Sequence, residues 1–156
     1  MTRIHGDKKL SRRTNIKPKN NYRDYENDLR IDFQDTCGYC GKIVEVSKSD
    51  FEIDHFVPKS LAKNKINNYD NLVYSCKQCN RKKSNKWPPQ DINMSHNGKE
   101  GFIDPVLEEY DEHLERTVNG DIIGINITGI TNAPFGYAPL SVKTFVTDNG
   151  NEFSFV

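Results

Sequence analysis

Two pairs of cysteines constrain what this chain can fold into more than any other feature of its sequence. Each pair has the spacing C-x-x-C, and together they hold all the cysteines of the chain, Cys37, Cys40, Cys76 and Cys79. In a chain without a secretion signal, such pairs are typical of a tetrahedral zinc site. Two disulfides, or free thiols, are the alternatives that the pattern leaves open. The segment 41–75 is longer than the insert of a simple zinc ribbon, so we expect a structural unit between the pairs.

The residues between and after the cysteine pairs predict a hairpin followed by a helix. Residues 51–56 have the composition of a short strand, which Pro58 ends because proline cannot continue a ladder. After a polar connection, residues 72–74 form the expected return strand. A helix then runs over about 76–86 and ends before two prolines. Zinc would pin the start of this helix to the base of the hairpin.

Three polar side chains are expected to face one gap between the hairpin and the helix. Asp54 and His55 lie on the first strand, and Asn80 follows Cys79 by one position, so it projects roughly 100° around the helix from that ligand. Carboxylate and amide oxygens suit Mg²⁺ or Mn²⁺. The imidazole of His55 can take a proton from water near neutral pH. Lys83, three residues past Asn80, is placed where it could meet a phosphate.

The net charge of the chain is zero, but its charges are segregated. Basic residues gather in residues 1–21 and 59–86, whereas the segment from Glu100 onward is strongly acidic. A basic front and an acidic back predict a polyanionic partner met by one side of the protein. Solvated charge runs without a partner explain the charge pattern alone equally well.

The chain divides into three expected parts. Residues 1–21 are expected to form a basic flexible arm, residues 22–90 a core that holds both cysteine pairs, with a leading helix over 22–35, and residues 91–156 a C-terminal α+β extension packed on the core. The extension is expected to contain a helix over 105–116 and strands over 122–127, 142–146 and 153–156. The apolar runs are too short to span a bilayer and no signal core is present, which predicts a cytoplasmic protein with no membrane partner.

Residues 37–87, about a third of the chain, resemble the HNH endonucleases within the ββα-metal (His-Me finger) nucleases. The shared pattern is C-x-x-C, then hydrophobic-Asp-His-hydrophobic-x-Pro, then Asn-Leu, then C-x-x-C-Asn/His-x-x-Lys. This chain supplies it with Cys37/Cys40, Ile53 to Pro58, Asn71-Leu72 and Cys76 to Lys83. The resemblance implies an α+β fold, in which a ββα-metal HNH core is stapled by a four-cysteine zinc site.

The resemblance also implies roles for individual residues. His55 would be the general base that activates water, and Asp54 with Asn80 would hold one divalent cation, Mg²⁺ or Mn²⁺. Asn71 would brace the loop and orient His55. Many members have histidine where Asn80 stands, which leaves the metal preference open. The cysteines would bind a structural zinc ion, and the residues expected to contact nucleic acid are Lys59, Arg81, Lys82 and Lys83.

The predicted function is metal-dependent hydrolysis of DNA phosphodiester bonds, with RNA not excluded. Restriction, phage defence and mobile elements are the settings in which small HNH proteins serve. A short chain with little targeting apparatus suggests a protein partner that supplies targeting, and double-strand cutting would favour a homodimer or successive nicks. The alternatives are a zinc-stapled nucleic-acid-binding module and an interaction subunit, both without catalysis.

Overall fold

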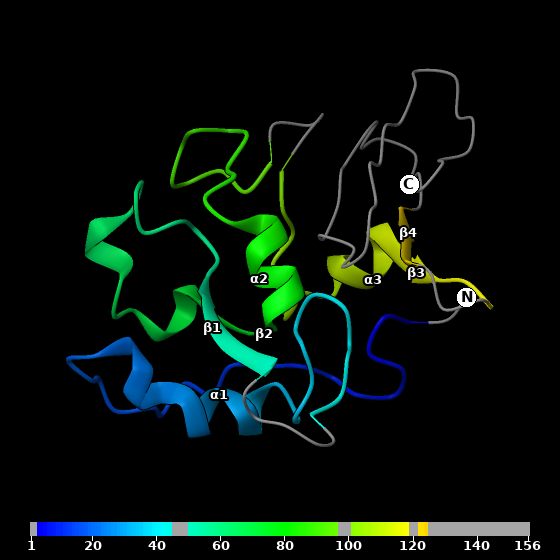
Figure 1. The fold of residues 1–156 in the computed structure, drawn as a ribbon, viewed down its shortest axis with the longest axis horizontal. Helices are drawn as coiled ribbons and strands as arrows, with labels where there is room; N and C mark the ends of the chain where they lie inside the picture. The colour runs from blue at the N-terminus through cyan, green and yellow to red at the C-terminus, as the bar shows by residue number, and fades with distance from the viewer. Residues whose placement is uncertain (1–2, 45–49, 97–100, 119–121, 125–156) are drawn as a thin grey trace.

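The centre of the protein is a hairpin followed directly by a helix (Figure 1). The computed structural model describes residues 3–44, 50–96, 101–118 and 122–124. Strand β1 (Phe51–His55) pairs antiparallel with β2 (Leu72–Cys76), in a register that places Phe51 opposite Cys76 and His55 opposite Leu72. Helix α2 (Lys77–Lys83) begins at the next residue. The predicted strand–strand–helix order is therefore confirmed.

The polar connection between the strands folds into two short 3₁₀ turns, η3 (Lys63–Lys65) and η4 (Tyr69–Asn71). Asn68 caps the second turn by accepting a hydrogen bond from the backbone of Asp70. Helix α2 ends at Lys83, three residues earlier than the sequence predicts. Ser84 has a positive φ of 50° and its N–H bonds to the Asn80 carbonyl, a geometry that turns the chain out of the helix.

A second helical element packs on the other side of the hairpin (Figure 1). It consists of the turn η1 (Tyr22–Tyr25) and helix α1 (Glu26–Asp32), and its contacts are with β2. Leu29 and Phe33 are fully buried against the hairpin. The predicted helix extends to residue 35, but α1 ends at Asp32 because the next turn holds two residues with positive φ, Gln34 and Asp35.

The N-terminal segment is packed on the core, whereas the composition predicts a flexible arm. Residues 3–21 form no helix or strand, yet Ile4 and Leu10 are almost fully buried. The side chain of Arg12 donates to the Leu72 carbonyl at 2.9 Å and to Asp104 at 2.8 Å. Two apolar anchors and a half-buried arginine are thus enough to hold a segment whose average composition is that of a solvated chain.

Basic residues of the N-terminal segment form ion pairs with acidic residues of the C-terminal part of the chain. Arg3 pairs with Asp111, Lys9 with Glu108, and Arg12 with Asp104. The charge segregation seen in the sequence therefore includes an internal match between the two ends of the described chain. Part of the basic front is neutralised within the protein, which reduces the surface that a polyanion could meet.

The described part of the C-terminal extension contains a shorter helix than the sequence predicts. Helix α3 (Glu109–His113) is followed by β3 (Leu114–Arg116), which pairs antiparallel with β4 (Ile122–Gly124). The predicted helix is wrong at its end because Leu114 adopts an extended conformation and pairs with Gly124. The strands predicted over 142–146 and 153–156 lie outside the described residues. Among the residues described, no helix is long and apolar enough to cross a membrane.

The contacts of Arg12 predict a clear difference between two N-terminal cations. Arg12→Met should lower the free energy of unfolding by about 2–3 kcal/mol, because it removes the counter-ion of the partly buried Asp104 and the side-chain donor to the Leu72 carbonyl. Lys9→Met, which removes an exposed ion pair, should leave it close to the wild-type value. Urea unfolding followed by circular dichroism measures both, and equal effects would contradict the docking of residues 3–21.

Candidate active site

The four cysteines converge on one point, as predicted from their spacing. Cys37 and Cys40 come from the turn after α1, Cys76 ends β2, and Cys79 lies in the first turn of α2. All four thiols are buried and free of disulfides, and their sulfur atoms lie within 4.8 Å of one another. The sulfurs of a tetrahedral zinc site with bonds of about 2.3 Å lie about 3.8 Å apart. The Cys40 and Cys76 sulfurs are 3.9 Å apart, so this donor set fits zinc.

Residues 37–40 form the first C-x-x-C turn, here called the first knuckle. Local packing explains why a glycine stands inside it. A Cβ on Gly38 would lie 2.7 Å from the Phe33 ring and 2.8 Å from Val73. The Gly38 N–H also bonds to the Tyr74 carbonyl at 2.8 Å. The knuckle is therefore pressed against β2, and a larger residue would push two cysteines away from their partners.

Asp54 is buried and bound by two donors. Its Oδ2 atom accepts a hydrogen bond from the Tyr39 hydroxyl at 2.6 Å and lies 3.0 Å from the Lys83 ammonium. Burial raises the pKa of the Asp54 carboxyl, and the Lys83 charge and the Tyr39 hydrogen bond act in the opposite direction. Both side-chain donors bond to Oδ2, so neither of them occupies Oδ1.

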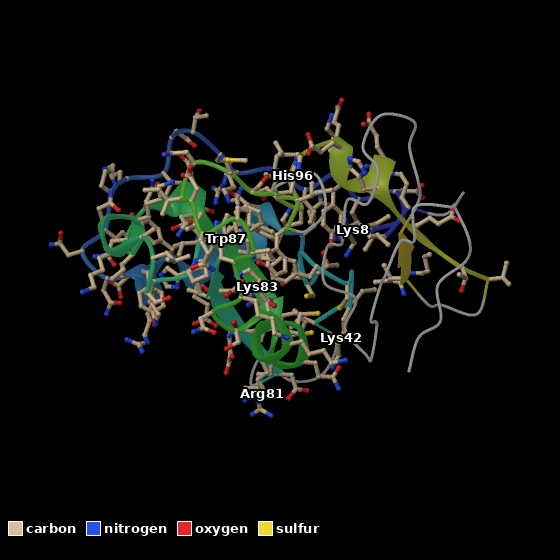
Figure 2. All side chains as sticks on the ribbon, turned by 90° about the horizontal axis from the view of Figure 1, so that it is seen from above. Lys8, Lys42, Arg81, Lys83, Trp87 and His96 are labelled. Atoms are coloured by element: carbon tan, nitrogen blue, oxygen red, sulfur yellow. The ribbon has the colours of Figure 1, made fainter. Side chains whose placement is uncertain are left out.

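Lys83 corrects one prediction from the sequence. We expected it to contact nucleic acid, but its side chain is fully buried and its ammonium also donates to the His55 carbonyl at 2.8 Å. Figure 2 shows Lys83 near the middle of the view and Arg81 at its edge. The reason is the helical period: three residues past Asn80, Lys83 faces β1 and not solvent. Burial lowers the pKa of the Lys83 ammonium, and the neighbouring Asp54 opposes that shift. Lys83 is the internal counter-ion of the site.

His55 is held in one orientation by two contacts. Its Nε2 lies 2.9 Å from the Ile66 carbonyl, and the Tyr22 ring meets the imidazole edge-on at 4.6 Å. Because a carbonyl oxygen can only accept, Nε2 carries the proton and Nδ1 keeps the lone pair. Burial lowers the pKa of His55, and the charges of Lys59 and Lys83 lower it further, against the effect of the carbonyl. A lowered pKa favours the neutral form of the imidazole at pH 7.

Asn80 contacts β1 through Glu52, a residue that the sequence did not single out. Its Nδ2 donates to Glu52 Oε2 at 2.7 Å. Glu52 stands two positions before Asp54, and strand alternation places both carboxylates on the face of β1 that α2 covers. A carboxylate can only accept, so this bond turns the carbonyl oxygen of Asn80 away from Glu52. The alternation was the available signal, but nothing in the motif singles out Glu52.

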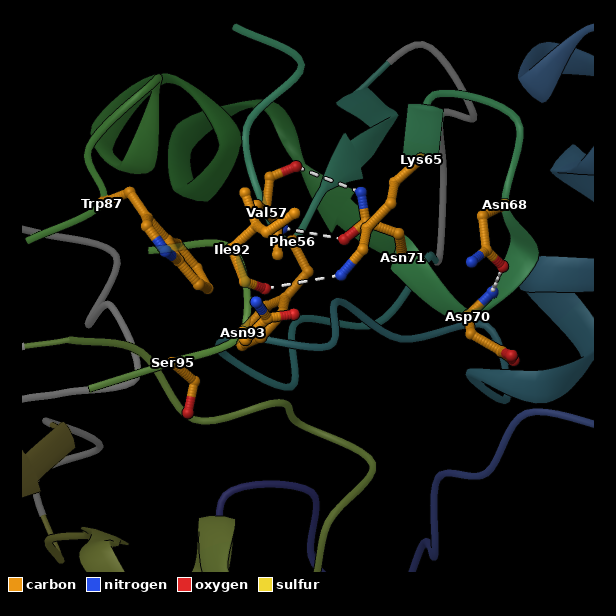
Figure 3. A pocket seen from close by; sticks show the side chains of 10 residues that line it. All are labelled: Phe56, Val57, Lys65, Asn68, Asp70, Asn71, Trp87, Ile92, Asn93 and Ser95. Carbon is orange, nitrogen blue, oxygen red and sulfur yellow. Dashed lines mark hydrogen bonds between the residues drawn. The ribbon is translucent and has the colours of Figure 1, made fainter. Parts of the chain in front are cut away.

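Asn71 is buried and braces the turn that follows β1 (Figure 3). Its side-chain oxygen accepts from the Val57 N–H at 2.9 Å, and its amide donates to the Val57 carbonyl at 3.1 Å. The backbone of Asn71 also accepts from the Phe56 N–H. These bonds fix the chain immediately after His55, so Asn71 acts on the loop and both of its side-chain bonds go to Val57.

The other predicted nucleic-acid contacts lie at the surface. Lys59 and Arg81 are exposed, and Lys82 is half-buried. Lys59 stands over the Tyr22 ring at 5.4 Å. Lys59, Tyr22, Glu52 and Asn80 all line a cavity of about 370 Å³ next to the hairpin. In the described part of the chain, the cysteines form the one cluster of three or more His, Cys or acidic ligands.

Comparisons with known proteins agree with this geometry. The family model of the HNH endonucleases matches residues 37–86, which confirms the resemblance and the ββα core with its cysteine cluster. A segment of 80 residues is 31% identical to the Septu protein PtuB of Bacillus thuringiensis. The aligned segment is 51% of this chain and spans 27% of that relative, about a quarter of its length. No solved structure matches the chain.

The cysteine cluster predicts that zinc and folding cannot be separated. Cys79→Ala should lose the bound zinc and unfold the domain, because the free energy of structural zinc binding, on the order of 10 kcal/mol, is folding free energy. Metal analysis and circular dichroism of the purified variant measure the two effects. In the wild type, unfolding by a chelator should be reversed by Zn²⁺ and not by Mg²⁺. A folded Cys79→Ala protein with one equivalent of zinc would show that the assignment is wrong.

Proposed function

We propose that this chain, whose residues 37–86 form an HNH endonuclease domain, is a metal-dependent nuclease that hydrolyses phosphodiester bonds of DNA. The observation that carries the proposal is the state of His55, a neutral imidazole whose Nε2–H is fixed on the Ile66 carbonyl. An isolated histidine on a strand needs no such arrangement. A general base needs such an arrangement, because its lone pair must be free and already oriented to take a proton when the reaction starts.

In this proposal His55 takes a proton from water at Nδ1 as the water oxygen attacks phosphorus. The bond between phosphorus and the 3′ oxygen then breaks, and the leaving oxygen takes a proton from solvent water, which gives 3′-hydroxyl and 5′-phosphate ends. Asp54, through Oδ1, and Asn80, through its amide oxygen, would hold one Mg²⁺ or Mn²⁺ ion. When bound, that ion supplies stabilisation of the negative charge on the phosphorane and on the leaving oxygen.

Glu52 supports this assignment as a positioning residue. An amide presents either its oxygen or its NH₂ group to a neighbour, and only the oxygen can bind a cation. The bond from Nδ2 to Glu52 selects the orientation in which the oxygen of Asn80 is available. Asn71 is proposed to act in the same indirect way, because it fixes the chain that follows His55.

Lys59 and Arg81 are proposed to bind the phosphates that flank the cut, with Lys82 beside them. Both Lys59 and Arg81 are exposed cations on elements that adjoin the site. DNA is the proposed substrate, and the contacts themselves do not distinguish it from RNA. The similarity to a Septu protein favours phage defence over the other settings, and a protein partner that brings this chain to its target belongs to the same proposal.

One observation favours a second candidate, a nucleic-acid-binding module without catalysis. The carboxylate of Asp54 already has a buried counter-ion in Lys83, so the site is electrically satisfied without a metal ion. In this case the zinc-stapled core would present Lys59 and Arg81 to a phosphate backbone and no bond would be cut. The two candidate functions differ in whether the protein cleaves the nucleic acid that it binds.

The nuclease proposal predicts a specific loss on removal of the base. His55→Ala should reduce Mg²⁺- or Mn²⁺-dependent plasmid nicking by about a hundredfold to ten-thousandfold, the usual contribution of a general base. Its zinc content and circular dichroism should match those of the wild type. His96→Ala, a histidine distant in the chain from the motif, should nick at the wild-type rate. Equal nicking by wild type and His55→Ala, or none by the wild type with any divalent metal, would favour the binding module.

The pKa of His55 predicts the pH dependence of the same reaction. A general base must be neutral, so the rate should fall as the pH drops through the His55 pKa, which burial and the nearby lysines hold below the ordinary value of about 6.5. Lys59→Gln removes one of those charges, so the midpoint of the acid limb should move to higher pH. Single-turnover rates across pH measure it, with Lys82→Gln as the control. An unshifted midpoint in Lys59→Gln would contradict the role of His55.

A further inference from the structure

The imidazole of His55 is held by two segments that are far apart in the chain. Its Nε2 bonds to the Ile66 carbonyl, which belongs to the connection between β1 and β2. Its other contact is the ring of Tyr22, in η1. A single hydrogen bond fixes one atom of a ring and still permits rotation, whereas a second contact against the ring restricts that rotation. The orientation of His55 therefore depends on where Tyr22 lies.

The position of Tyr22 is not secured by its own segment. Tyr22 is half-buried, and it precedes the residues that the family model matches, 37–86. The turn η1 is four residues long, and 3₁₀ turns of that length have poor hydrogen-bond geometry of their own. A contact from outside the turn is therefore needed to keep the Tyr22 ring on the imidazole.

Asn67 supplies that contact. It lies in the connection between the strands, next to the residue whose carbonyl binds the imidazole. Its Oδ1 accepts from the Tyr22 N–H at 3.0 Å, and its Nδ2 donates to the Asn20 carbonyl at 2.8 Å. The backbone carbonyl of Asn67 accepts from the hydroxyl of Tyr25, a buried side chain, at 3.3 Å. One residue thus joins the two segments that hold the proposed base.

An amide is the side chain that these bonds require. It carries a donor and an acceptor on one planar group, and here the acceptor meets an N–H while the donor meets a carbonyl. An alanine would lose both bonds. Asn67 is exposed, and the net contribution of an exposed hydrogen bond to the stability of the whole protein is modest. Loss of these bonds should therefore move Tyr22 without unfolding the domain.

We infer that Asn67 is a positioning residue for His55, and that its side chain keeps the Tyr22 ring against the imidazole. This inference rests on the proposed nuclease function, in which His55 is the base. It adds Tyr22, a residue outside the stretch matched by the family model, to the site. Without the two bonds the ring leaves the imidazole, His55 samples other orientations, and fewer molecules hold the geometry that proton transfer needs.

The orientation of His55 can be measured without DNA and without Mg²⁺ or Mn²⁺. Proton–nitrogen NMR spectra of the zinc-loaded protein, with isotope-labelled histidine, report the tautomer at about pH 8, where an imidazole is neutral. The His55→Ala variant identifies the signals of His55. The wild type should show the Nε2–H tautomer, with proton shifts displaced by the Tyr22 ring. Asn67→Ala should show both tautomers and shifts nearer to those of free imidazole.

A neighbouring asparagine provides the control. Asn64 is an exposed residue of η3 in the same connection, so Asn64→Ala should keep the wild-type spectrum. Zinc content and circular dichroism of both variants should match those of the wild type. Signals of His55 that are identical in Asn67→Ala and in the wild type would overturn the inference.

Nicking kinetics separate positioning from DNA binding. Tyr22→Leu should lower kcat about tenfold to a hundredfold, the loss expected for a misplaced reacting group, while KM stays the same. Tyr22→Phe keeps the ring and should restore kcat. A raised KM with unchanged kcat in Tyr22→Leu would make Tyr22 a DNA contact and overturn the inference. A wild type that nicks with no divalent metal added or present in the series contradicts the nuclease function alone, and the NMR comparison still decides the role of Asn67.

Discussion

The convergence of four cysteine thiols is the constraint on which the rest of the structure depends. The hairpin has two strands of five residues, and an isolated two-stranded hairpin is marginally stable at best in water. Helix α2 is seven residues long, shorter than an isolated helix needs to be stable. Cys37 and Cys40 bring a distant turn to the point where β2 becomes α2, so one bound ion would hold three short elements that could not stand alone.

The buried pair of Asp54 and Lys83 answers a problem that every buried carboxylate faces. A desolvated carboxylate without a counter-charge is costly. Lys83 supplies that charge from inside the same ββα unit, on the oxygen that also accepts from Tyr39. Burial raises the pKa of the Asp54 carboxyl, and the charge of Lys83 opposes that shift.

The motif residues could be placed from the sequence because their geometry is local. The C-x-x-C spacing, the Asp-His pair and the turn of α2 each set directions within a few residues, and the hairpin register follows from residues 51–56 and 72–76. Apart from the helix ends set by local positive-φ residues, the main misses depend on long-range contacts. In the sequence Lys83 resembles a surface charge, and the packing of β1 against α2 is what buries it. Residues 3–21 look disordered until Arg12 meets Asp104, more than ninety positions away, and residues 114–116 look helical until β4 pairs with them.

The hydrogen bond from Tyr39 to Asp54 has a consequence for where the functional module begins. Tyr39 stands inside the first cysteine knuckle, between two of the sulfur ligands, while Asp54 belongs to the hairpin that follows. The two sites are thus joined by one phenol, and they cannot be transplanted or minimised independently. A fragment that starts at the hairpin would keep the Asp-His pair in its sequence and lose the group that orients the carboxylate. The knuckle, the hairpin and the helix therefore form one functional unit.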